Sequence, residues 1–155
     1  ISSARPKIAD YPFTTKAPVL GVVNIHGGAT FVVAEIPGLI EGAHLGKGLG
    51  DRFLKHVERT KVLIHLVDIA ACEGRDPYKD YVGLNKELRL YSKPLIRKSQ
   101  FIALNKSDLE QAKENIKKFE KRLRGKKVYP ISAVTGEGVK KLLSAVYKKI
   151  VQYGK

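Results

Sequence analysis

This sequence of 155 residues has little cysteine, no long apolar run and no methionine, and each absence excludes a class of protein or an interpretation of the chain. Its single cysteine, Cys72, excludes an internal disulfide framework and favours a reducing compartment. No apolar run approaches the roughly 20 residues that a membrane-spanning helix needs, and no cleavable signal segment is visible. We therefore expect a cytoplasmic protein without a membrane span. Methionine is absent even at the first position, so we interpret the chain as part of a longer protein.

Acidic residues are also scarce. The chain has 29 lysines and arginines against 15 aspartates and glutamates, which gives a formal net charge of +14. Summed positive charge attracts polyanions such as RNA, although a lysine-rich helix is often only a solvated surface. Both interpretations stay open for the basic residues that crowd one stretch of the second half: Lys113, Lys117, Lys118, Lys121, Arg122, Arg124, Lys126 and Lys127.

Apolar runs alternate with helical patterns along the chain, which predicts an α/β fold. Strands at 19–23 and 29–33 flank a Gly-Gly turn, as in an antiparallel hairpin. A nearly continuous apolar run at 62–67 indicates a strand covered on both faces. Two further strands are expected just before Asn105 and Ser132, and helices at 76–91, 109–123 and 139–151. No interdomain linker is visible, so we expect a single domain.

The most informative motif is Asn105-Lys106-Ser107-Asp108, which directly follows an apolar run. An aspartate carboxylate at a strand end can accept two hydrogen bonds from adjacent donors, and guanine offers such a pair where adenine does not. Taken alone, four polar residues after a strand are usually just a turn. The motif therefore needs support from other segments.

That support comes from four more segments in a fixed order. They are Asp10-Tyr11-Pro12-Phe13-Thr14-Thr15, Glu35-Ile36-Pro37-Gly38, the glycine-rich stretch from Gly38 to Gly50, and Ser132-Ala133-Val134. In this order and context, the segments resemble the nucleotide-binding loops of the Obg family of GTPases. The resemblance covers nearly the whole chain.

The resemblance implies a P-loop GTPase-type fold: an open, mostly parallel sheet with helices on both faces and one antiparallel hairpin strand. The family begins this domain with a strand and a phosphate-cradling loop of the form G-x-x-x-x-G-K-[ST], and no such segment occurs here. We therefore expect residues 1–155 to form a single Obg-type GTP-binding domain that is incomplete at its N-terminus, with its first strand missing. By itself, this fragment is expected to be inactive.

At the base, the resemblance gives each residue of the motif a role. Asn105 would brace the loop, Lys106 would lay its stem along the purine, and Asp108 would pair with the guanine ring nitrogens, with Ser107 between them. Ser132, Ala133 and Val134 would bring backbone amide to the guanine carbonyl oxygen.

At the phosphate end, Thr15 resembles the switch threonine that coordinates Mg²⁺. Phe13, Thr14, Lys16 and Ala17 are its flanking nucleotide contacts. Residues Glu35, Ile36, Pro37 and Gly38 resemble the D-x-x-G loop, with glutamate where the family usually has aspartate. One extra methylene moves the carboxylate by about 1.5 Å, which puts Mg²⁺ affinity and turnover in doubt.

Two functions remain open. The first is a GTP hydrolase that binds GTP or GDP with Mg²⁺ and acts as a slow switch in large ribosomal subunit assembly or a stress response, with ribosomal RNA as a partner. Leu39 cannot orient the attacking water as a glutamine would, which fits slow turnover, and no residue is assigned as catalytic. The second is a non-hydrolysing basic module that binds RNA or protein.

Overall fold

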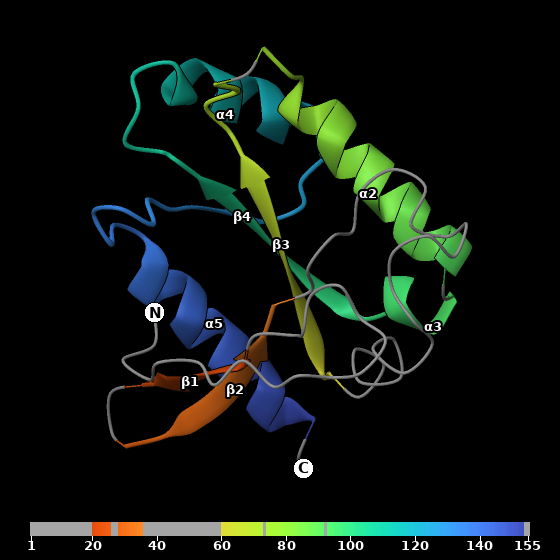
Figure 1. Ribbon diagram of the computed structural model, residues 1–155, viewed down its shortest axis with the longest axis vertical. Coiled ribbons are helices and arrows are strands. Elements are labelled where there is room, and N and C mark those ends of the chain that lie inside the picture. The colour runs from red at the N-terminus through yellow and green to blue at the C-terminus, as the bar shows by residue number, and fades with distance from the viewer. Residues whose placement is uncertain (1–19, 26–27, 36–59, 73, 92, 154–155) are drawn as a thin grey trace, which may run out of the picture. The chain divides into compact units, whose positions relative to one another are not determined.

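The computed structural model describes residues 20–25, 28–35, 60–72, 74–91 and 93–153 (Figure 1). The chain divides into two compact units. One comprises residues 1–60 and 84–97, and the other comprises residues 61–83 and 98–155.

The first unit contains the predicted hairpin. Strand β1 (Leu20–Asn24) pairs antiparallel with β2 (Thr30–Ala34), with Leu20 opposite Ala34. The Ile25 amide donates to the Ala29 carbonyl oxygen at 2.8 Å and closes the turn. Gly28 lies there at a φ of +78°, a conformation that glycine adopts without steric cost. A short helix, α3 (Lys93–Ile96), which the sequence did not predict, also belongs to this unit.

The second unit is built on a parallel sheet. Strands β3 (Val62–Asp68), β4 (Ser99–Asn105) and β5 (Val128–Pro130) pair in the order β3-β4-β5. Asp68 lies opposite Asn105 in the register, so two polar residues meet where the strands end. The carboxyl ends of parallel strands are where ligands bind in open α/β sheets.

Helices cover both faces of this sheet. Alternation along β4 places Ile102 and Leu104 on one face, where they join an apolar cluster with Phe119 and Leu123 at helix α4 (Ala112–Arg122). Ala103, on the opposite face, is fully buried as well. Helix α5 (Val139–Gln152) contacts β3 and β4 and buries Leu142, Leu143 and Val146. The predicted α/β architecture with helices on both faces is confirmed.

The helix ends follow from local chemistry. Asp76 precedes helix α2 (Pro77–Tyr91), and its Oδ1 accepts hydrogen bonds from the amides of Tyr78 at 2.9 Å and Lys79 at 3.2 Å. Asp76 thus acts as an N-cap, and it satisfies amides that the helix itself leaves without partners. Within the described part of the chain, no helix has the length and apolarity to cross a membrane.

Candidate functional site

The loop that follows β4 is a tight turn held from both sides. Lys106 has a φ of +64°, which is uncommon for a residue with a side chain. Its carbonyl oxygen accepts from the Leu109 amide at 3.2 Å, and the Ser107 amide donates to the Ile131 carbonyl oxygen at 3.0 Å. The loop is therefore tied to the segment that follows β5.

The segment after β5 is organised around Ser132, which is fully buried. Its Oγ accepts from the Thr135 amide at 3.1 Å, and its own amide donates to the Glu137 carbonyl oxygen at 3.0 Å. These bonds fold residues 132–137 into a closed turn. Val134, next to it, is 90 % exposed and available to a ligand.

One hydrogen bond joins the two loops directly. The Ala133 amide donates to Oδ1 of Asn105 at 3.0 Å. Asn105 thus connects the polar motif after β4 to the turn after β5. The bond also engages the Ala133 amide, so a guanine carbonyl oxygen would have to share or displace Asn105 at that donor.

In the loop after β4, the Lys106 ammonium pairs with Asp68, a residue that the sequence pattern did not single out. The Lys106 ammonium donates to Asp68 Oδ2 at 2.6 Å and lies 3.7 Å from the Cys72 sulfur. The hydrogen bond to Asp68 raises the pKa of Lys106, so its ammonium stays protonated. Asp108, in contrast, is exposed, so an incoming base can reach it.

The residues predicted at the phosphate end fall largely outside the described part of the chain. Of them, only Glu35 is described, and it is an exposed residue directly after β2. The others are Phe13, Thr14, Thr15, Lys16, Ala17, Ile36, Pro37 and Gly38. An exposed carboxylate at a strand end offers the hard oxygen that Mg²⁺ prefers, so Glu35 fits this ion chemically. The described ranges contain no group of three or more acidic, histidine or cysteine residues that could hold a metal by themselves.

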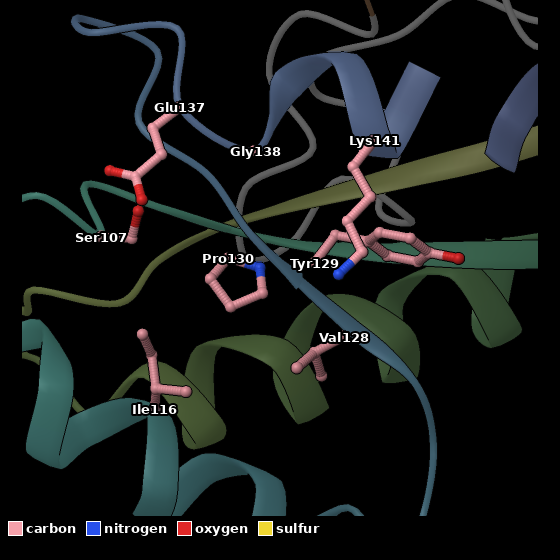
Figure 2. Close-up of a pocket in the computed structure, with 8 residues that line it drawn as sticks. All are labelled: Ser107, Ile116, Val128, Tyr129, Pro130, Glu137, Gly138 and Lys141. Atoms are coloured by element: carbon pink, nitrogen blue, oxygen red, sulfur yellow. The ribbon is translucent and has the colours of Figure 1, made fainter. Parts of the chain in front are cut away.

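A cavity of about 370 Å³ lies beside the loop after β4 (Figure 2). Its lining mixes polar and apolar side chains from several elements: Ser107, Ile116, Val128, Tyr129, Pro130, Glu137, Gly138 and Lys141. In Figure 2, Ser107 and Glu137 lie toward one end and Lys141, from α5, toward the other. Ser107 is the one residue of the polar motif in the lining, so the cavity borders the candidate base site without including Asp108.

The family model described as 50S ribosome-binding GTPase matches residues 1–128. The chain belongs to this GTPase family. Most of the predicted site, from Phe13 to Asp108, lies inside the matched range, and Ser132–Val134 follow just after it.

Curated relatives carry the name GTPase Obg. The chain is 59 % identical over 142 residues to the Obg of Thermoanaerobacter sp. (strain X514), covering 90 % of this chain and 33 % of that protein. It is 54 % identical over 155 residues to the Obg of Symbiobacterium thermophilum, covering 99 % of this chain and 36 % of that protein. The predicted resemblance to Obg is confirmed. The chain spans about a third of the length of these relatives.

Solved structures support the fold. Era, determined with MgGDPNP and part of 16S ribosomal RNA, matches with a TM-score of 0.61 at 24 % identity, over 88 % of this chain and 45 % of Era. The G domain of the T. maritima FeoB iron transporter matches with a TM-score of 0.58 at 22 % identity, over 99 % of this chain and 86 % of that domain. At such identities the likeness shows the fold alone, which is that of P-loop GTPases.

Proposed function

We propose that this chain is the guanine-nucleotide-binding domain of an Obg-type GTPase, with the base held between the loop after β4 and the turn after β5. The observation that carries the proposal is the Asn105–Ala133 hydrogen bond, in a chain that belongs to this GTPase family. The bond ties together the two segments that guanine would contact, at the sheet edge where such ligands bind. The whole of residues 1–155 is proposed to be one nucleotide-binding domain.

Asp108 reads the base in this proposal. Its carboxylate accepts from the ring N–H and the exocyclic amine of guanine, and adenine has no matching pair of donors. Lys106 lays its stem on the purine face, and Ser132, Ala133 and Val134 close the site around the carbonyl oxygen. A site built for these donors rejects a base that lacks them, because its polar groups would be left unpaired.

The phosphate end uses the segments around Thr15 and Glu35. Thr15 would hold Mg²⁺ through its hydroxyl, and the Glu35 carboxylate would hold it through a water molecule, with Gly38 meeting the terminal phosphate. When bound, the ion would neutralise charge that develops on the phosphates. The loops around Thr15 and Gly38 would respond to the terminal phosphate, which would make the domain a switch. Leu39, which cannot orient the attacking water, fits slow turnover.

We also propose a polyanionic partner, the RNA of the large ribosomal subunit. Helix α4 presents Lys113, Lys117 and Lys121 as exposed residues spaced four apart, on one side of the helix. Such a row of cations suits the phosphate backbone of RNA. The alternative of a non-hydrolysing basic module would use this row without the base site.

Titration separates the two functions. In the full-length protein, labelled GDP should bind tightly and labelled ADP should not, and Asp108→Ala should weaken GDP binding without improving ADP binding. Equal affinity for both nucleotides, or GDP binding that Asp108→Ala leaves unchanged, would exclude the base site and favour the basic module.

A further inference from the structure

Asp68 is fixed by a contact on each of its two carboxylate oxygens. Oδ1 accepts from the Ala70 amide at 3.1 Å, and Oδ2 accepts from the Lys106 ammonium at 2.6 Å. The first bond orients the carboxylate within its own loop, and the second draws the flexible lysine side chain toward it. Asp68 thus acts on a residue 38 positions later in the chain.

The sheet determines this pairing. Asp68 lies opposite Asn105 in the parallel register, and the Ile69 amide donates to the Asn105 carbonyl oxygen at 3.1 Å. The lysine is therefore the next residue after the strand position that Asp68 faces. Two rigid strand ends, rather than two mobile loops, bring the charges together.

We propose that Asp68 is a positioning residue for base recognition, which anchors the Lys106 ammonium so that the lysine stem is ready to lie along the purine. This inference rests on the proposed function. A lysine side chain has many rotamers, and holding its end in place before the ligand arrives lowers the entropy that binding must remove. The raised pKa of Lys106 fits an ammonium that stays charged and anchored.

The anchor has a second consequence, for Asp108. In the sequence, Lys106 stands two positions before Asp108, whose carboxylate reads guanine in the proposed function. Once Asp68 engages the Lys106 ammonium, the Asp108 carboxylate does not have to give up an ion pair before it accepts the guanine donors. Removing the Asp68 charge frees Lys106 to compete with guanine for Asp108.

The ion pair is partly solvated, with side-chain exposures of 42 % for Lys106 and 41 % for Asp68. Exposed ion pairs contribute little to folding stability. Loss of the charge should therefore alter nucleotide affinity far more than it alters the unfolding midpoint, which distinguishes a positioning role from a structural one.

The test is a double-mutant cycle on the full-length protein, with labelled GDP as the probe. Asp68→Asn should raise the GDP dissociation constant about three- to tenfold and leave the unfolding midpoint unchanged, and Asp68→Glu should restore part of the affinity. In a Lys106→Met background, Asp68→Asn should have no further effect. The matched control is Asp80→Asn, since Asp80 is 42 % exposed and pairs with Arg75 at 2.9 Å.

The outcomes are distinct. The inference fails if the Asp68→Asn variant binds GDP like the parent. It also fails if Asp68→Asn weakens GDP binding by the same factor in the parent and in the Lys106→Met background. It also fails if Asp80→Asn loses as much affinity as Asp68→Asn. If the parent itself does not bind GDP, the proposed function fails, and the inference with it.

Discussion

His65 stacks on Tyr81 inside the second unit, with ring centroids 4.9 Å apart and planes inclined by 33°. The histidine is 7 % exposed, and its Nδ1 has no hydrogen-bond partner among the described residues. Burial lowers the pKa of His65 to about 4, since the charged imidazolium loses its hydration there. The native domain therefore holds this histidine neutral at pH 7.

This contact predicts a loss of stability in acid. The unfolded chain binds a proton at His65 near pH 6.5 and the folded domain only near pH 4, so protons favour unfolding between those values. Relative to pH 7, the His65 contribution to the free energy of unfolding should fall by about 2 kcal/mol at pH 5. His65→Phe, which keeps a ring against Tyr81, should remove this part of the decline. Urea unfolding at pH 7 and pH 5 measures the free energy of unfolding of both proteins. An equal fall between the two pH values in parent and variant would contradict the prediction.

Substitution of Gly138 by alanine should destabilise the domain more than the same substitution of Gly136. Gly138 has a φ of +71°, and a Cβ there would clash with the Pro130 carbonyl oxygen. Gly138→Ala should destabilise the domain by about 2–4 kcal/mol, from backbone strain together with the clash. Gly136→Ala is the matched control, because its φ of +82° is similar but nothing lies within 4 Å of its added Cβ. It should cost only about 1–2 kcal/mol. Equal unfolding midpoints for the two variants would refute the close approach.

Much of the second unit could be predicted because apolar pattern and turn chemistry agree there. The parallel strands are apolar runs, Asp76 is a capping residue directly before Pro77, and Gly125, with a φ of +85°, follows the end of α4. All three are local signals. The helix expected from Leu109 begins at Ala112 instead, because the Leu109 amide closes the turn onto Lys106. Apolar spacing alone does not distinguish a turn from a first helical residue.

The contacts of the site were harder to foresee. Neither the left-handed backbone of Lys106 nor its pairing with Asp68 follows from spacing. The pairing depends on the register of β3 and β4, and the backbone conformation belongs to the turn that the Leu109 amide closes onto Lys106. A signal for Asp68 did exist. It is a carboxylate directly after the apolar run 62–67, in the same position that singled out Glu35 and Asn105 after their own strands.

The basic row on α4 predicts a salt-dependent interaction with RNA. Replacing Lys113, Lys117 and Lys121 by glutamine in the full-length protein should weaken binding to large-subunit ribosomal RNA. It should also reduce the slope of log affinity against log salt by about 2–3. Lys118→Gln is the control, because the Lys118 ammonium already pairs with Glu114 at 2.7 Å. An unchanged slope of log affinity against log salt in the triple variant would show that these lysines do not contact the RNA.

The phosphate end predicts opposite effects for two substitutions. Thr15→Ala in the full-length protein should lower Mg²⁺-dependent GTP turnover and leave GDP affinity nearly intact, because the threonine would act only with the terminal phosphate present. Glu35→Asp should raise turnover or reduce the Mg²⁺ concentration required. Hydrolysis measured against Mg²⁺ concentration tests both. Parent-like behaviour of Thr15→Ala would exclude its switch role, and loss of activity in Glu35→Asp would show that the longer carboxylate is the working one.

The assignment of Asp108 as the reader of guanine is tested most directly by exchanging its acceptors. Xanthine differs from guanine in carrying a carbonyl oxygen in place of the exocyclic amine, so an asparagine at 108 can accept from the ring N–H and donate to that oxygen. The dissociation constants of GDP and of xanthosine diphosphate are measured for the full-length protein and for its Asp108→Asn variant. The variant should lose roughly 30-fold or more in GDP affinity and bind xanthosine diphosphate more tightly than GDP. Unchanged GDP affinity with no gain for xanthosine diphosphate would contradict the assignment.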